Sequence, residues 1–293
     1  MDVKQKISIR FFEDREVRAV WDDEHSKWWF SVLDIVGVLK EEPDYPKVRN
    51  YWKYLKAKLK RENNQLVSAT TQLKLTASDG KKYQTDLLDS KGIVELSKNF
   101  PNNKASKFLD WFLYSDTSID GQSKKKAYTL SESNLINEFE VGTTKGLQQI
   151  HAYLFGGLYD FSGQIRTKSI SKGSYQFVFA QHLKNTLEGI DAMPQSTLDE
   201  IILKYAEMNK AHPFMEGNGR STRIWLDLIL KKQLKCCVDW SRITKADYMK
   251  AMIISIVDSS EIGKLIKHAL TTDIHSQEMY MKGIDYSYYY EEN

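Results

Sequence analysis

Cysteine is scarce in this 293-residue sequence, and its two cysteines, Cys236 and Cys237, are adjacent. An adjacent pair suggests neither a disulfide framework nor a metal site, so we expect a reducing, cytoplasmic environment. Long apolar runs are also missing, because none approaches the roughly 18 residues that a membrane span needs. The first residues, MDVKQKISIRFF, are polar and charged and contain no apolar signal core. The sequence therefore predicts no membrane segment and no signal peptide.

The composition excludes a disordered chain, since 41% of the residues are hydrophobic and 28% are charged, as in ordinary soluble proteins. A chain of this length forms two domains or one large one. The net charge of +3 is small but unevenly distributed. The first 114 residues hold 21 basic and 17 acidic residues, whereas the remainder holds 21 and 22. The basic surplus of the N-terminal part is a first hint about its partners.

The N-terminal part has the pattern of short strands. Apolar and polar residues alternate at 7–12 and 17–21, and residues 28–32 (WWFSV) form a third strand-like run. Ser31 is placed to cap a short helix that ends near Leu39. We further expect a helix from about Lys47 to Arg61, irregular chain and strands from 63 to 88 with a turn at Asp79-Gly80, and helices near Ser90 and Lys104. This pattern predicts a small α+β domain over residues 1–114.

Residues 115–127 (SDTSIDGQSKKKA) are polar and contain a lysine run, which is typical of a linker. We expect them to form a solvated tether between two domains. Residues 128–293 then show helical periodicity, interrupted by a predicted β-hairpin at 165–179 around Lys172-Gly173-Ser174. The predicted helices are 131–139, 143–155, 181–190, 196–211, 219–234, 245–256, 260–272 and 275–282.

Residues 212–223, HPFMEGNGRSTR, place poor helix starters at the point where an apolar helix begins. His212-Pro213 ends the preceding helix, because a residue before proline disfavours the α conformation. Gly217-Asn218-Gly219 lets the backbone bend and approach a ligand closely. A helix N-terminus that follows such a loop offers free N–H groups and a positive dipole end, so the local pattern indicates an anion site. Phe214 is expected to anchor the loop in the core.

The side chains of this stretch fit a bound polyphosphate. Arg220 and Arg223 share a face of the first helical turn, where each costs about 0.3–1 kcal/mol unless an anion reverses the sign. Glu216 beside phosphate oxygens is what Mg²⁺ binds, and His212 is a base near neutral pH. Each residue alone is usually structural, as a helix end, a turn or a solvated cation. Together they predict nucleotidyl or phosphoryl transfer, and the missing GxxxxGK[ST] excludes a P-loop.

The same stretch matches, without departure, the HxFx(D/E)GNGRxxR signature of the Fic domain. The resemblance covers about residues 128–293, including LYDFSGQIRTKSISKG before the hairpin and YMKAM at 248–252. It implies an all-α domain with a β-hairpin flap. It also implies protein adenylylation, in which AMP moves from ATP to a hydroxyl of a target protein and pyrophosphate is released. Gly219 favours AMP transfer, because the family's phosphate-transferring Doc branch has lysine there.

The resemblance implies a role for each motif residue. His212 would deprotonate the target hydroxyl, and Glu216 would hold Mg²⁺. Arg220 and Arg223 would hold the outer phosphates of ATP. The phosphates would be cradled by Gly217, Asn218 and Gly219, with Asn218 near the α-phosphate. The hairpin resembles the family's flap, on which a target segment adds as a strand, here at Lys172, Gly173, Ser174 and Tyr175.

The C-terminal segment, residues 284–293, is polar and rich in tyrosine, and its composition alone predicts a frayed end. SYYYEE at 287–292 resembles the (S/T)xxxE(G/N) inhibitory motif that some Fic proteins carry on a C-terminal helix, with Ser287 and Glu291 as its motif residues. In those proteins the Glu pairs with the second motif arginine and blocks productive placement of the γ-phosphate. Here that pair would be Glu291 and Arg223. The sequence departs from the motif at Glu292, where Gly or Asn is usual. The tyrosines close to the site also make self-modification an expectation.

The predicted helix at 47–61 carries seven basic residues and no acidic one. Four of them step by 4, 3 and 4 residues and therefore share a face, which is usually only a solvated surface. Tyr51, Leu55 and Leu59 lie on another face. The four candidates for DNA contacts are Arg49, Lys53, Lys56 and Lys60.

Residues 7–113, including NYWKYLKAKLK and PNNKASKFLDWF, are similar to the BRO N-terminal domain of phage antirepressor-type proteins, a family associated with DNA binding. If the four candidate cations contact phosphates, log K should fall with log salt at a slope of about −3.6. A flat salt response would favour a protein-docking module instead.

These features favour a cytoplasmic, autoinhibited protein adenylyltransferase that uses ATP and Mg²⁺ and carries an appended recognition domain. Two alternatives remain open. One is a DNA-binding transcriptional regulator whose Fic domain is mostly silent, and the other is a Fic enzyme that uses another nucleotide donor or removes AMP. The family resemblance also suggests a homo-oligomer, whereas nothing in the sequence fixes the nucleotide base or the target protein.

Overall fold

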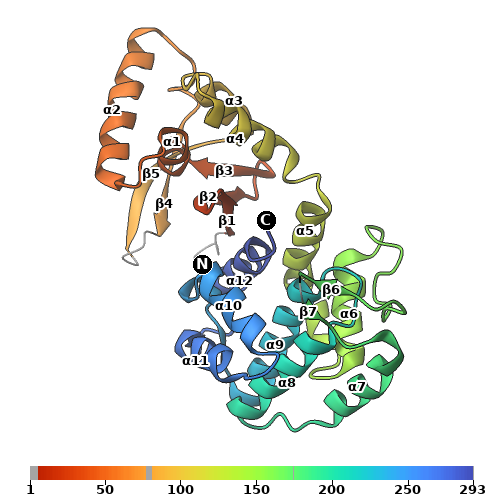
Figure 1. Cartoon of the computed structure of the whole chain (residues 1–293). Helices are drawn as coiled ribbons and strands as arrows, with labels where there is room; N and C mark the ends of the chain where they lie inside the picture. Colours follow the sequence, from red (N-terminus) through yellow and green to blue (C-terminus); the bar gives the residue numbers. More distant parts are fainter. Residues whose placement is uncertain (1–5, 77–80, 174, 293) are drawn as a thin grey trace. The chain divides into compact units, whose positions relative to one another are not determined.

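The structure is a computed structural model that describes residues 6–76, 81–173 and 175–292. Two compact units divide the chain, Met1–Asp116 and Thr117–Asn293 (Figure 1). The first combines a sheet with helices and the second is mainly helical, so the predicted α+β class is confirmed. No helix of the described residues is long and apolar enough to cross a membrane.

The N-terminal unit is built on an antiparallel sheet with the strand order β1-β2-β3-β5-β4. Alternating residues made these strands predictable, and the early strands lie where the sequence placed them. The predicted turn at Asp79-Gly80 lies outside the described residues. The strands are β1 (Ile7–Phe12), β2 (Arg15–Asp22), β3 (Lys27–Ser31), β4 (Thr71–Thr76) and β5 (Lys82–Leu88).

Helices complete the N-terminal core. Ser31 caps the first of them as predicted, because its Oγ accepts a hydrogen bond from the backbone N–H of Asp34 at 3.3 Å. Buried side chains of that helix, Ile35 and Leu39, belong to one cluster with Phe108 and Phe112. The helices are α1 (Val32–Lys40), α2 (Tyr45–Arg61), α3 (Ser90–Ser97) and α4 (Asn103–Tyr114).

The C-terminal unit packs its helices around α9, whose Trp225, Ile229 and Leu230 are fully buried. Helices α6, α8 and α12 all contact α9 (Figure 1). The helices are α5 (Ile119–Glu132), η1 (Leu135–Glu138), α6 (Thr144–Phe155), α7 (Ala180–Ala192), α8 (Leu198–Ala211), α9 (Asn218–Leu234), η2 (Trp240–Arg242), α10 (Lys245–Ile254), α11 (Ser260–Ala269) and α12 (Gln277–Tyr289). Two short hairpins pair β6 (Ser171–Lys172) with β7 (Tyr175–Gln176), and β8 (Cys237–Val238) with β9 (Leu270–Thr271).

The predicted solvated tether at 115–127 is wrong for most of its length, because α5 starts at Ile119. Ser118 caps this helix by accepting a hydrogen bond from the N–H of Gly121 at 3.0 Å. Its buried face carries Ser123, Ala127 and Leu130, two of which are too small or polar to give a clear apolar stripe. The predicted helix at 131–139 is accordingly split between the end of α5 and the 3₁₀ helix η1.

The frayed C-terminus that composition alone predicts is also wrong. Helix α12 continues to Tyr289, well beyond the predicted end at 282. Tyr286 and Tyr288 of this helix and the C-cap residue Tyr290 are buried, so the run of tyrosines supplies the packing that a polar composition concealed. The Tyr290 hydroxyl lies 2.8 Å from the carbonyl oxygens of both Trp240 and Ile243.

Candidate active site

The loop between α8 and α9 is closed by its own hydrogen bonds. Helix α8 ends at His212, which adopts the left-handed conformation with φ 49°, and Gly217 caps α9 with φ 80°. The Asn218 side chain accepts from the N–H of Phe214 and donates to its carbonyl oxygen, both at 2.8 Å. The Asn218 side chain therefore stabilises the loop, whereas the Asn218 backbone forms the start of α9. Phe214 is fully buried, as expected for an anchor.

His151 of α6 packs against this loop and supports it. This residue was not predicted from the sequence. Its ring stacks on Phe214 with 3.8 Å between centroids. Its Nδ1 accepts from the N–H of Gly163 at 2.8 Å, so Nε2 carries the proton and donates to the carbonyl oxygen of Glu216 at 2.9 Å. Burial lowers the pKa of His151 to about 4, which keeps the ring neutral. His151 is thus a neutral side chain that supports the backbone of Glu216, the candidate metal-binding residue.

His212, the candidate base, packs next to the hairpin. Its ring stacks on Phe177, next to the hairpin, with 3.8 Å between centroids. Its Nδ1 lies 3.3 Å from the carbonyl oxygen of Asn209, which can only accept, so Nε2 keeps the lone pair that a general base needs. Burial lowers the pKa of His212 to about 4, and the imidazole is therefore neutral at pH 7.

Arg166 fixes the backbone of His212 and was not singled out from the sequence. Its guanidinium donates to the carbonyl oxygens of His212 at 2.7 Å and Ala211 at 3.0 Å. It also donates to the carbonyl oxygens of Lys168 at 2.7 Å and Val178 at 2.5 Å, on either side of the hairpin. One buried cation therefore ties the hairpin to the end of α8.

The two motif arginines are buried at the N-terminal end of α9. Arg223 is 1% exposed, and its guanidinium meets Ser287 Oγ at 2.7 Å and the Ser287 carbonyl oxygen at 2.6 Å. It also donates to the Tyr248 hydroxyl at 2.9 Å and to Glu291 Oε1 at 2.6 Å. Arg220 is 3% exposed and pairs with Glu216 at 2.7 Å and with Asp120 of α5. Both arginines are therefore occupied by partners from within the chain.

Glu291 lies directly over the start of α9. Any Cβ at Gly219 would overlap its carboxylate, so the glycine is what allows this close approach. Burial alone would raise the pKa of Glu291, but the charge and hydrogen bond of Arg223 outweigh burial and lower that pKa. Glu291 is therefore ionised at neutral pH, and the predicted partners Ser287 and Glu291 are brought together on Arg223.

The hairpin lies close to these groups. Lys172 ends β6 and faces Tyr175 across a turn in which Gly173 adopts φ 59°. Lys172 is exposed, and its charge acts on the pKa values of both His212 and Glu291. The structure thus places the predicted flap beside the candidate base, while Ser174 lies outside the described residues.

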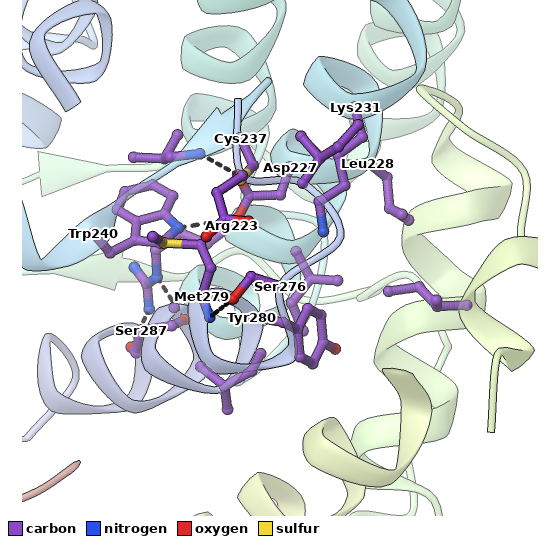
Figure 2. A pocket seen from close by; sticks show the side chains of 17 residues that line it. Arg223, Asp227, Leu228, Lys231, Cys237, Trp240, Ser276, Met279, Tyr280 and Ser287 are labelled. Atoms are coloured by element: carbon purple, nitrogen blue, oxygen red, sulfur yellow. Dashed lines mark hydrogen bonds between the residues drawn. The ribbon is translucent and has the colours of Figure 1, made fainter. Parts of the chain in front are cut away.

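Beneath Arg223 lies a cavity of about 20 Å³, between α9 and α12. Figure 2 shows Asp227, Trp240 and Ser287 around it. Asp227 accepts from the indole N–H of Trp240 at 3.0 Å and from the N–H of Val238 at 2.9 Å. This volume suits about one water molecule, so the cavity belongs to the packing of α12 and is no nucleotide pocket.

Residues 142–230 match the model of the Fic/DOC family, and residues 16–118 match that of the BRO family N-terminal domain. The chain carries a Fic/DOC domain. It also carries a BRO-family N-terminal domain, so both resemblances seen in the sequence are confirmed.

Two curated proteins are similar to this chain in sequence. One is the protein adenylyltransferase VbhT of Bartonella schoenbuchensis, 27% identical over 162 residues, which are 50% of this chain and 32% of that protein. The other is the probable protein adenylyltransferase y4lH of Sinorhizobium fredii, 27% identical over 118 residues, which are 36% of this chain and 61% of that protein. The matches therefore span less than two thirds of either relative.

Solved structures of similar fold include the BepC protein of Bartonella tribocorum with bound AMPPNP, at 19% identity and a TM-score of 0.44. That match covers 59% of this chain and 92% of BepC. A second is the type IV secretion system effector protein BepA, at 22% identity and a TM-score of 0.44, covering 56% of this chain and 63% of BepA. A third is a Fic domain from Bartonella quintana with bound ADP, at 15% identity and a TM-score of 0.43, covering 52% of this chain and 83% of that one.

The Fic domain offers one carboxylate to a metal at the motif loop. Glu216 has a side chain that is 56% exposed, and its Oε1 accepts from the N–H of Gly217 at 2.9 Å. Among the described residues, no three His, Cys, Asp or Glu side chains gather into a metal site. This donor set fits Mg²⁺ only when phosphate oxygens and water supply the other ligands.

In the BRO-family domain, α2 exposes a basic face. Arg49, Lys53 and Lys60 are exposed, as expected of that face. Lys56 is half-buried and pairs with Asp86 at 2.8 Å, which the sequence could not show. The apolar side of α2 buries Val48, Trp52, Leu55 and Leu59, so the predicted amphipathic helix is confirmed.

Proposed function

We propose that the Fic domain transfers AMP from ATP to a hydroxyl of a target protein and that α12 inhibits this reaction. The observation that carries the proposal is the placement of a neutral His212 beside a helix N-terminus at which Arg220 and Arg223 are buried. Buried arginines at that end of a helix oppose its dipole, and a bound polyphosphate reverses the sign. Two curated relatives are named protein adenylyltransferases, one of them as probable. Their names support the same reaction.

In this proposal the phosphates of ATP lie on the backbone N–H groups at the start of α9, clamped by Arg220 and Arg223. His212 Nε2 accepts the proton of the target hydroxyl while its oxygen attacks the α-phosphorus. The bond to the β-phosphate oxygen breaks, and pyrophosphate leaves. Mg²⁺ held by Glu216 and phosphate oxygens would offset the charge of the leaving group. With ATP as the donor, we propose that the reaction takes place in the cytoplasm.

The hairpin would hold the target. Strands β6 and β7 are short and exposed, and Lys172, Gly173 and Tyr175 lie at its described tip. A target segment that adds to this edge as a further strand would bring its hydroxyl toward His212, since Arg166 ties the hairpin to the His212 backbone. Specificity would then come from side chains on the hairpin, with Ser174 as a further candidate.

The proposed inhibition follows from the position of Glu291. Its carboxylate pairs with Arg223 at 2.6 Å and lies against Gly219, where an outer phosphate of ATP would bind. Removal of this carboxylate frees the arginine and the helix end. Hydrogen bonds to charged groups contribute about 1.5–3 kcal/mol, so Glu291→Gly should raise AMP transfer about tenfold to a hundredfold.

The test uses ATP labelled at the α-phosphate, with Mg²⁺, on the full chain alone and with bacterial lysate. We expect weak protein labelling by wild type, strong labelling by Glu291→Gly, and a loss of about 10²–10⁴-fold when His212→Ala is added to Glu291→Gly. Equal labelling in wild type and Glu291→Gly would remove α12 from the regulation. No label in any variant would contradict AMP transfer from ATP and direct the same assay to other nucleotide donors.

A second function is proposed for the BRO-family domain. The exposed cations Arg49, Lys53 and Lys60 of α2 lie on one side of a helix that buries its other side, which is suited to contacts with DNA phosphates. DNA binding would make the chain a regulator as well as an enzyme. Salt-dependent binding to duplex DNA tests this role separately from AMP transfer.

A further inference from the structure

Asp120 is an acidic partner of the phosphate clamp that lies outside the Fic motif. Its carboxylate pairs with Nη1 of Arg220, whereas Glu216 pairs with Nη2 at 2.7 Å. We propose that Asp120 is a second internal competitor for the phosphates of the nucleotide, which acts on Arg220 as Glu291 acts on Arg223. This inference rests on the proposed AMP transfer, because it concerns the same phosphate site.

The surroundings of Arg220 limit how a phosphate can approach its guanidinium. The arginine side chain is 4% exposed, and its guanidinium lies over the rings of Phe155 at 5.0 Å and Tyr288 at 5.8 Å. The N–H groups of a guanidinium point outward in its plane, so a phosphate binds in that plane, where Asp120 and Glu216 now lie. A phosphate oxygen on Nη1 therefore has to displace the Asp120 carboxylate.

Asp120 is not needed to shape its own helix. Ser118 already caps α5 through the N–H of Gly121, and the Asp120 side chain is 54% exposed. A carboxylate in a first helical turn adds only a small dipole stabilisation. The contact with Arg220 is consequently free to break without unwinding α5.

Helix α5, which carries Asp120, is joined to helix α12, which Glu291 follows. Asp285 of α12 is fully buried, pairs with Lys124 of α5 at 2.7 Å and accepts from the Tyr128 hydroxyl. The Tyr280 hydroxyl of α12 also donates to the carbonyl oxygen of Ala127 at 2.9 Å. Helices α5 and α12 are therefore packed together and supply partners to both arginines of the clamp.

The test measures binding of ATP, ADP and AMP by calorimetry to Glu291→Gly and to Asp120→Asn/Glu291→Gly. We expect ATP and ADP to bind about twofold to fivefold more tightly to the double variant, the range typical of partly exposed ion pairs, and AMP to bind equally to both. AMP lacks the outer phosphates that would reach Arg220. Asp199→Asn/Glu291→Gly is the matched control, because Asp199 is the second residue of α8 as Asp120 is of α5.

Equal affinities for ATP in all three proteins would overturn the role of Asp120 while leaving AMP transfer standing. An equal gain for AMP would overturn it as well, since that gain would not come from the outer phosphates. Asp120→Ser provides a second variant with the same expected gain, and Asp120→Glu, which keeps the charge, should show less than half of it. Failure of AMP transfer itself is read separately, as absent labelling by Glu291→Gly.

Discussion

Helix α2 of the BRO-family domain and the motif helix α9 of the Fic domain hold their cations in opposite environments. Arg49, Lys53 and Lys60 of α2 are exposed, whereas Arg220 and Arg223 of the Fic domain are buried. An exposed cation costs little and has many uses, so its presence says little about function. A buried arginine loses its hydration and persists only with partners. The exposure of a cation, rather than its charge alone, therefore indicates whether the fold needs partners for it.

The partners of the buried arginines carry the second half of this comparison. Arg223 is surrounded by Glu291, Ser287 and Tyr248, all supplied from outside its own helix. Burial alone would lower the pKa of Arg223, but the nearby hydroxyls and Glu291 raise it, so the guanidinium stays charged. Internal groups thus occupy Arg223, to which the proposed function assigns an external phosphate.

Loss of a buried charge should have the largest effect on folding. We expect Asp285→Ala to lower the free energy of unfolding by about 3–5 kcal/mol, because it leaves Lys124 without its buried carboxylate. Lys53→Ala, on the exposed face of α2, should change it by less than about 0.5 kcal/mol. Urea unfolding of the two variants measures both values. Similar losses in the two would contradict the contrast between the domains.

The same substitution tests how α12 is held. If Asp285 keeps α12 on α5, then Asp285→Ala should also raise AMP transfer, though less than Glu291→Gly does, because Arg223 keeps its own acid. A destabilised variant with unchanged labelling would separate the stability of α12 from its inhibitory contact.

Lowering the pH should reduce the free energy of unfolding of the Fic domain, because the buried His151 is neutral in the folded chain and gains a proton on unfolding. His151 has a pKa of about 4 in the folded chain against an ordinary 6.5, so its contribution is complete above pH 6.5 and is lost as pH falls toward 4. Between pH 7 and pH 5 this amounts to about 2 kcal/mol. His151→Gln, which can still donate to the Glu216 carbonyl, should remove that part of the pH dependence. His182→Gln on α7, at an exposed site, is the control in the same urea titration. An unchanged pH dependence in His151→Gln would show that His151 is not buried as described.

The motif loop was predictable because its determinants are local. His212, Phe214 and Glu216 fall within five residues, and their spacing alone places a base, an anchor and an acid at a helix start. The supporting residues were not predictable in this way. Asp120 meets Arg220 across 100 positions of sequence, and His151 meets Glu216 across 65.

Two elements were misjudged for a related reason. α5 buries small and polar residues such as Ser123 and Ala127, so its pattern resembles that of a solvated tether. α12 buries tyrosines whose hydroxyls find partners inside the domain, so a polar composition hid a packed helix. In both, the burying surface comes from another part of the chain, and periodicity within the segment cannot reveal it.

The smallest expected effects concern the exposed face of α2. With Lys56 engaged by Asp86, three of the four candidate cations remain for DNA, and the slope of log K against log salt should be about −2.7 rather than −3.6. Lys53→Gln should reduce that slope by about 0.9, whereas Lys56→Gln on the same helix should leave it nearly unchanged. Fluorescence anisotropy with a labelled duplex between 50 and 200 mM salt, a range over which such contacts are resolved, measures each slope.

Equal changes of the slope in the two variants would mean that the pair with Asp86 does not keep Lys56 from contacting DNA. A flat response in wild type would contradict DNA binding and make this exposed face a docking surface for protein, so that the contrast between exposed and buried cations would still separate recognition from chemistry.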